Sequence, residues 1–371
     1  MANLFDPIKV GDLELKHRIV MSPLTRSRAG ENLAPREMNV EYYTQRSSAA
    51  LIISEATHVF PQGIGYPFTP GIGTEEQIAG WKKVVDSVHA AGGKIFLQLW
   101  HVGRISHRVM QENNDLPVSA SAIKPAGELF TGKGMMEFET PRALDLEEIP
   151  GIVEYFRTGA ENAKKAGFDG VEIHGANGYL LDQFLEDGTN KRTDEYGGAI
   201  ENRARLLLEV VDEAIKIWGA NRVGVRLSPA GSFSDMSDSN QSETFGYVAE
   251  KLGERKIAYL HVIEPEPSNA VKYTVNGEQI SAVKHLKSIF KGTVIAAQGY
   301  DLASGNAVVE SGDADLVAFG KLFIANPDLP ERFLQNAPLN PPVESAFYGG
   351  GEHGYTDYPT LEKAKSANAK N

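Results

Sequence analysis

Three side chains with complementary chemistry occur close together near the middle of the sequence. Two glycines, Gly175 and Gly178, lie among His174, Asn177 and Tyr179, and glycine allows a loop to turn tightly. A histidine and an asparagine can each donate a hydrogen bond to one carbonyl or nitro oxygen, which stabilises the enolate-like charge that grows as hydride adds to the β-carbon. The tyrosine hydroxyl can then supply a proton.

The same segment also has a purely structural interpretation, in which it forms a capped turn with Tyr179 partly buried. The spacing alone does not decide between the two. His174 directly follows an apolar run at 170–173, and the catalytic residues of α/β barrels lie at the carboxyl ends of their strands. The elements around the segment therefore decide what it can do.

Short apolar runs alternate with longer amphipathic stretches, which is typical of βα units around a parallel sheet. The predicted strands are 19–21, 50–55, 94–99, 170–173, 223–227, 259–263, 293–297 and 315–319. The predicted helices include 78–90, 150–166, 201–218, 243–255 and 301–309. Eight such units predict an α/β fold, a closed (β/α)8 TIM barrel.

An open doubly wound sheet is the structural alternative. Such a sheet normally has a glycine-rich fingerprint after its first strand, whereas here Ser22-Pro23-Leu24-Thr25 follows Met21. Apolar residues on both faces of the strands also favour the barrel. Before the first strand, 8–10 and 13–15 flank Gly11-Asp12, a strong hairpin signal. We expect residues 1–17 to form a ribbon that closes the barrel bottom.

The pattern predicts one domain over residues 1–371. Two segments, 103–145 and 175–199, exceed ordinary loop length and would emerge at the carboxyl face of the barrel, where active sites lie. We expect the first to be a capping insertion; a tolerated surface insertion is the alternative. The Lys/Ala-rich tail at 361–371 is predicted to fray.

Composition excludes several functional classes. The net charge of −12 repels phosphate backbones and anionic lipid, so we expect neither nucleic-acid nor membrane partners. The sequence has no cysteine, which excludes disulfides, thiolate metal sites and cysteine nucleophiles and indicates the cytoplasm. No apolar segment approaches the ~20 residues of a membrane span, and no targeting signal is visible. No metal site is predicted.

Beyond single motifs, the sequence resembles the old yellow enzyme family over nearly its whole length. The shared segments, in the family's order, are Leu4-Phe5-Asp6-Pro7, Met21-Ser22-Pro23-Leu24-Thr25-Arg26, Gln98-Leu99-Trp100-His101-Val102-Gly103-Arg104, Arg192-Thr193-Asp194-Glu195-Tyr196-Gly197-Gly198, Glu201-Asn202-Arg203 and Tyr355-Thr356-Asp357-Tyr358-Pro359. The sequence is most similar to the bacterial branch with the pentaerythritol tetranitrate, morphinone and N-ethylmaleimide reductases, and is similar to plant oxophytodienoate reductases.

This resemblance implies an FMN-dependent ene-reductase that takes hydride from NADPH or NADH and passes it, in a ping-pong reaction, to an electrophilic alkene. The acceptors would be α,β-unsaturated ketones, aldehydes, maleimides or nitroalkenes. His174 and Asn177 would hold the activating oxygen, and Tyr179 would protonate the α-carbon. The oligomeric state would be a monomer or a homodimer.

The resemblance also assigns residues around a non-covalent FMN over the barrel mouth. Cofactor-binding positions are Pro23, Leu24, Thr25, Ala56, Gln98, Arg226, Gln298, Gly299, Gly320 and Lys321. Substrate-binding positions are Tyr66, Trp100, His174, Asn177, Phe323 and Tyr348. Thr25 would bond the O4 side of the flavin, Gln98 and Arg226 its pyrimidine edge, and the loops after the seventh and eighth strands its phosphate.

The sequence departs from its relatives at two of these positions. Lys321 stands where they usually carry arginine, so the charge is kept but the bidentate fork is lost. Asn177 stands where some bacterial relatives have a second histidine. Two alternative functions remain: a cofactor-free aldolase or isomerase that uses His174 and a lysine, and a flavin-binding protein without catalysis.

Overall fold

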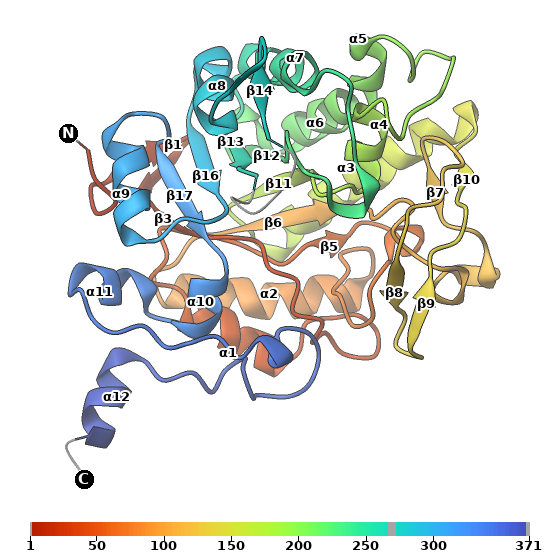
Figure 1. The fold of residues 1–371 in the computed structure, drawn as a ribbon. Coiled ribbons are helices and arrows are strands. Elements are labelled where there is room, and N and C mark those ends of the chain that lie inside the picture. The colour runs from red at the N-terminus through yellow and green to blue at the C-terminus, as the bar shows by residue number, and fades with distance from the viewer. Residues whose placement is uncertain (1, 266–271, 369–371) are drawn as a thin grey trace.

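Parallel strands close into a barrel in the computed structural model, which describes residues 2–265 and 272–368 (Figure 1). In order around the barrel, the strands are β3 (Ile19–Met21), β4 (Leu51–Ile53), β6 (Ile95–Trp100), β11 (Gly170–Gly175), β12 (Val223–Leu227), β13 (Tyr259–Ile263), β16 (Val294–Ala297) and β17 (Leu316–Phe319). The β17–β3 and β6–β11 pairings complete the ring. The short β5 (Thr57–His58) also pairs with β6. The predicted TIM barrel and its eight strands are confirmed.

Helices surround the barrel (Figure 1). They are α1 (Glu37–Gln45), α2 (Glu75–Ala90), α3 (Ile149–Ala166), α4 (Leu180–Leu185), α5 (Ile200–Arg203), α6 (Arg205–Trp218), α7 (Gln241–Glu254), α8 (Ala282–Phe290), α9 (Leu302–Glu310), α10 (Lys321–Ala325), α11 (Leu329–Leu334) and α12 (Leu361–Asn368). The helix predicted at 201–218 is two helices, α5 and α6. The sequence prediction did not name α1, whose buried face consists of Asn39, Tyr42 and Tyr43 rather than aliphatic residues.

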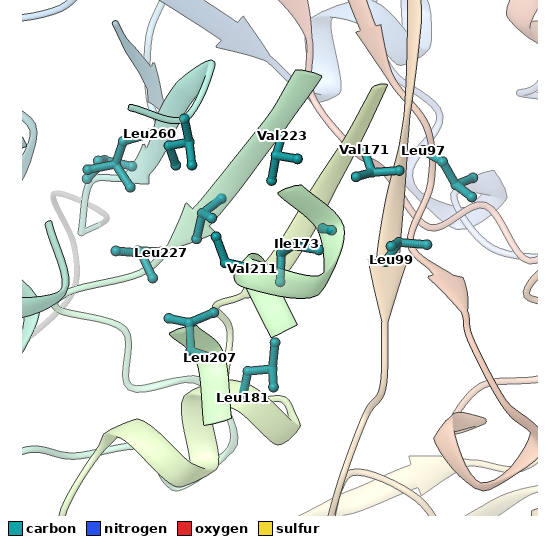
Figure 2. Packing of buried hydrophobic residues seen from close by; sticks show 14 of the residues in the cluster. Leu97, Leu99, Val171, Ile173, Leu181, Leu207, Val211, Val223, Leu227 and Leu260 are labelled. Carbon is teal, nitrogen blue, oxygen red and sulfur yellow. The ribbon is translucent and has the colours of Figure 1, made fainter. Parts of the chain in front are cut away.

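Side chains alternate between the two faces of each strand, and this alternation sets up the site. Leu97 and Leu99 of β6 and Ile173 of β11 point outward into the main buried cluster, which also contains Val211 of α6 (Figure 2). Phe96 belongs instead to the cluster inside the barrel. Because successive side chains of a strand point to opposite faces, Gln98 lies on the inner face with Phe96.

The predicted amino-terminal ribbon is confirmed. β1 (Ile8–Val10) pairs antiparallel with β2 (Leu13–Leu15), and their apolar side chains join the cluster inside the barrel. At the turn, Gly11 has a φ of 55°, and a Cβ there would lie 1.9 Å from the Asn221 carbonyl oxygen. Since Asn221 lies two residues before the start of β12, the ribbon closes the amino-terminal end of the barrel.

The long segment 103–145 contains two small sheets. One pairs β8 (Glu128–Phe130) with β9 (Met135–Glu137), and the other pairs β7 (Val118–Ser119) with β10 (Arg142–Ala143). Among the residues that the structure describes, no helix is long and apolar enough to cross a membrane.

Part of the tail at 361–371, which we predict to fray, is helical in the structure. Residues 361–368 form α12, whereas 369–371 lie outside the described residues. Leu361 is buried and its amide donates to Asp328 Oδ2 at 2.5 Å, while Thr360 Oγ1 accepts from the Lys363 amide at 3.3 Å. Good helix formers such as Ala, Lys and Glu follow this start, so the composition favours a helix.

Candidate active site

A layer of polar side chains faces the barrel interior where the strands end. Gln98 of β6 donates to Glu172 Oε1 of β11 at 2.8 Å. Glu172 Oε2 lies 2.9 Å from His261 Nδ1 of β13. Arg226 of β12 is in register with both His174 and His261. All five side chains are buried, so their charges act through a medium of low polarity.

Burial and charge work against each other in this layer. Burial alone would raise the pKa of Glu172, but His261, Arg226 and Gln98 together hold that pKa below its usual value. The carboxylate is therefore ionised. Burial lowers the pKa of Arg226, and Glu172 partly offsets this effect; an arginine keeps its proton in proteins.

The Arg226 guanidinium is incompletely satisfied by the described residues. Its Nε has no hydrogen-bond partner, and Nη2 makes only a long bond of 3.4 Å to Ser22 Oγ. Buried donors of this kind normally have acceptors. The arrangement thus fits an acceptor-rich ligand placed over the strand ends, and the pyrimidine edge of a flavin has that chemistry.

Aromatic rings assemble beside this layer. The Trp100 ring packs edge-on against Tyr179, with centroids 4.9 Å apart, and stacks on Tyr66 at 5.7 Å. His174 packs edge-on against Tyr179 at 5.1 Å. The Tyr66 and Tyr179 hydroxyl oxygens lie 3.2 Å apart. Four of the site residues that the sequence predicts are therefore in contact in the structure: Tyr66, Trp100, His174 and Tyr179.

The protonation states of this cluster are defined by burial. Burial lowers the pKa of His174 well below 6.5, and the charges of Arg226 and His261 lower it further. Burial raises the pKa of Tyr179 well above 10 and that of Tyr66 to about 12. His174 is consequently a neutral imidazole and Tyr179 keeps its proton over the physiological range.

The loop that carries Asn177 is held in a constrained turn. Asn177 has a φ of 58°, a left-handed conformation that asparagine tolerates better than most residues. Its amide donates to Ser228 Oγ at 2.8 Å, and the Gly178 amide donates to Asp182 Oδ2 at 2.8 Å. A Cβ on Gly178 would lie 2.7 Å from Met236 Cγ, so glycine is required there.

A cavity of about 830 Å³ opens above this cluster. Among the predicted site residues, Thr25, Tyr66, Tyr179 and Tyr348 line it. Segment 103–145 contributes further lining residues, among them Phe130 of β8. The long insertion thus forms a wall of the cavity.

Other predicted cofactor positions lie around the strand ends. Pro23 and Leu24 follow β3, and Ala56 follows β4. The position of Gly320 at the start of α10 brings it next to Leu24, since a Cβ there would lie 3.3 Å from Leu24 Cδ2. Lys321 is largely exposed, and its Nζ lies 3.5 Å from Glu344 Oε1.

After β16, the chain turns through two residues in the left-handed region. Gln298 has a φ of 84° and Gly299 a φ of 77°. This turn and the start of α10 follow the seventh and eighth barrel strands, the positions at which barrels commonly bind phosphate.

Phe323 lies apart from the aromatic cluster, and like Trp100, His174 and Asn177 it is not among the described residues that line the cavity. Its side chain is fully buried in the main core cluster, on α10, and is absent from the cavity lining among the described residues. Its carbonyl accepts from Arg46 Nε at 3.0 Å. Phe323 follows the eighth strand on α10, and its ring packs into the core.

Arg26 and Arg28 are site residues that sequence reasoning did not single out. Arg26 Nε donates to the Phe347 carbonyl at 2.9 Å, and Arg28 Nη2 donates to the Ala346 carbonyl at 2.9 Å. These bonds fasten the carboxyl-terminal segment that places Tyr348 over the cavity. The acceptors are backbone carbonyls. Because every residue has one, the amino-acid sequence does not show which carbonyls accept these bonds.

Comparison with known proteins assigns this site to a family. A family model described as NADH:flavin oxidoreductase / NADH oxidase family matches residues 3–340. The chain belongs to this family. It is 47% identical over 367 residues to 12-oxophytodienoate reductase 2 of Arabidopsis thaliana, across 97% of this chain and 96% of that protein. It is 46% identical over 365 residues to 12-oxophytodienoate reductase 1 of Oryza sativa subsp. japonica, across 97% and 93%.

Solved structures support the same assignment. The chain is similar to morphinone reductase in complex with tetrahydroNAD, with a TM-score of 0.93, 48% identity and coverage of 98% of this chain and 99% of that chain. It is also similar to the old yellow enzyme homologue from Zymomonas mobilis, with a TM-score of 0.92, 43% identity and coverage of 97% and 100%. The predicted resemblance to old yellow enzymes is confirmed. The protein is an NAD(P)H-dependent flavin oxidoreductase of the ene-reductase type, with FMN as its cofactor.

Proposed function

We propose that this old yellow enzyme reduces the carbon–carbon double bond of α,β-unsaturated ketones, aldehydes, maleimides or nitroalkenes with NADPH or NADH. One observation carries the proposal: Tyr179 lines the cavity and its ring packs against His174, which is in register with the underbonded Arg226 on the neighbouring strand. Because both substrates would use this one cavity, the reaction is ping-pong.

Bound FMN supplies the hydride that adds to the β-carbon. The Arg226 guanidinium and the Gln98 amide would hold its pyrimidine edge, with Thr25 on the O4 side. The other residues that we assign to FMN are Pro23, Leu24, Ala56, Gln298, Gly299, Gly320 and Lys321. Backbone amides at the turn after β16 and at the start of α10 suit a phosphate.

The chain's own residues then act on the acceptor. Neutral His174 and Asn177 donate hydrogen bonds to the activating oxygen, which stabilises the charge that develops there. Tyr179 gives its proton to the α-carbon. The Tyr66 hydroxyl, 3.2 Å away, is placed to bond to the phenolate oxygen that this transfer leaves.

A turnover screen tests the function directly. Purified FMN-loaded enzyme is assayed without oxygen on 2-cyclohexenone, N-ethylmaleimide and a nitroalkene, with NADPH and NADH in parallel. We expect saturated products with at least one nicotinamide. Flavin binding without turnover on any of the three acceptors would contradict the proposal and favour a non-catalytic flavin protein.

The aldolase alternative gains no support from the cavity. A Schiff-base aldolase needs a lysine at the reacting carbonyl, and none of the described residues that line the cavity is a lysine.

The alkene step should show no ionisation of His174 or Tyr179 between pH 6.5 and 10. The pKa of His174 lies well below 6.5 and that of Tyr179 well above 10, so neither group changes charge in that interval. Burial raises the pKa of Asp182 and that of Glu55 to about 7, so an inflection near this pH would belong to these carboxyls. Single-turnover reoxidation rates across the interval check this. An inflection that disappears in His174→Gln would contradict it.

Replacing Lys321 by arginine should tighten FMN binding by up to about 10-fold, because arginine bonds phosphate in a bidentate manner. The measurement is the FMN dissociation constant of both proteins, by fluorescence titration of apoprotein. Lys321→Met serves as the loss-of-charge control and should bind more weakly than wild type. An unchanged constant for Lys321→Arg would place the phosphate away from this residue.

A further inference from the structure

Four aromatic side chains are exposed around the mouth of one cavity. Phe68, Phe130, Phe233 and Tyr348 have exposed fractions of 49%, 52%, 58% and 70%, and all four line the 830 Å³ cavity. Together they are called the aromatic rim. Nine large hydrophobic side chains are exposed in the described part of the chain, and these four are all of the aromatic ones. Exposed apolar residues normally scatter over a surface, whereas a cluster marks a binding region.

The rim is assembled from four separate parts of the chain. Phe68 precedes α2, Phe130 lies on β8, Phe233 follows β12, and Tyr348 belongs to the carboxyl-terminal segment. No single local motif explains why the four meet, which favours selection for a shared surface over the by-product of one loop.

Hydrogen bonds to the backbone fix the rim in place. Phe68 has a φ of 56°, and its carbonyl accepts from the Ala29 amide at 3.0 Å. A bulky residue keeps a left-handed conformation only where its surroundings impose it, and such positions gather at ligand sites. Buried Arg104 donates to the Ser234 carbonyl beside Phe233 at 2.7 Å. The rim is thus preorganised, which lowers the cost of binding a ligand.

The charge of the cavity indicates what the rim binds. Glu128 is the only residue with a formal charge among the described residues that line the cavity. The pyrophosphate of a nicotinamide nucleotide would be expected to meet lysine or arginine. A neutral, apolar or aromatic group fits this lining better.

We propose that the aromatic rim is an outer subsite for the acceptor, which takes a neutral aryl or alicyclic group attached to the activated alkene. The enzyme would therefore favour acceptors with such an extension over small ones. The inference rests on the proposed function, because it places the reacting end of the acceptor at Tyr179 and the apolar end at the rim.

Two maleimides with the same reacting double bond test the subsite. We compare kcat/KM for N-ethylmaleimide and N-benzylmaleimide in wild type, Phe130→Ala and Phe233→Ala. Met135→Ala is the matched control, because Met135 pairs with Phe130 across the same hairpin and is 58% exposed but does not line the cavity. Wild type should prefer the benzyl compound. Each rim variant should lose about 3- to 10-fold on the benzyl compound and less than about 2-fold on the ethyl compound.

Three outcomes would overturn the subsite. The first is an equal loss of kcat/KM on both maleimides in the rim variants. The second is the same selective loss in Met135→Ala. The third is a rise in the KM for NADPH alone, which would assign the rim to the nucleotide. Binding of the unreactive N-benzylsuccinimide and N-ethylsuccinimide to holoenzyme, by calorimetry, gives a readout that needs no turnover. If wild type reduces neither maleimide, the proposed function fails, while selective weakening of N-benzylsuccinimide binding in Phe130→Ala would still support the subsite.

Discussion

Replacing Tyr179 by phenylalanine is expected to slow alkene reduction by about 10²- to 10⁴-fold, the usual contribution of a positioned acid, and to leave flavin reduction by NAD(P)H unchanged. The substitution removes only the hydroxyl. The ring contacts with Trp100 and His174, with centroids 4.9 Å and 5.1 Å away, are kept. Stopped-flow absorbance of each half-reaction measures the two rates separately.

A control for Tyr179→Phe is available in the same cavity. Tyr348 also lines the cavity but is 70% exposed, so Tyr348→Phe should leave the alkene step nearly unchanged. Equal losses in both half-reactions for Tyr179→Phe would show that the ring positions FMN or substrate and is not the proton donor.

The second large effect is expected for Arg226→Met, which should weaken FMN binding by about 10- to 100-fold, the range for a lost hydrogen bond to a charged group. The apoprotein should keep its thermal stability. Arg226 Nε has no partner among the described residues, so the substitution removes a buried, poorly paired charge. Glu172 retains Gln98 and His261 as partners.

Arg222 offers a matched control for Arg226→Met. It directly precedes β12, at the opposite end of the strand, and bonds to the Asp169 carbonyl at 2.9 Å. Arg222→Met should leave FMN affinity unchanged. FMN titration and thermal unfolding of the apoproteins give both readouts. Unchanged FMN affinity in Arg226→Met, or a large loss of apoprotein stability, would refute the role of Arg226 toward FMN.

The sequence predicted the barrel because its signals are local. Apolar runs and their helical partners can be read one segment at a time, and the hairpin at Gly11 follows from two residues. The site residues that lie at the ends of these strands could be predicted, because the apolar runs show where the strands end. An arginine inside an apolar strand requires a buried anion nearby, and the charge of Glu172 on the neighbouring strand β11 partly offsets the effect of burial on the pKa of Arg226.

The features that were missed depend on contacts between distant segments. Arg26 and Arg28 bind carbonyls more than 300 residues away, for example Phe347. The ring of Phe323 lies in the core because of its orientation on α10. The number of residues between Phe323 and the eighth strand does not reveal this orientation. The aromatic rim has no sequence signal either, since its four members meet only after folding.

The most direct test of the account is an anaerobic titration of the purified protein. We predict one FMN per chain, with visible flavin absorbance that is lost on addition of NAD(P)H and returns when 2-cyclohexenone is added, with formation of the saturated ketone. A protein that cannot be reconstituted with FMN, or whose reduced flavin is not reoxidised by any activated alkene, would contradict it.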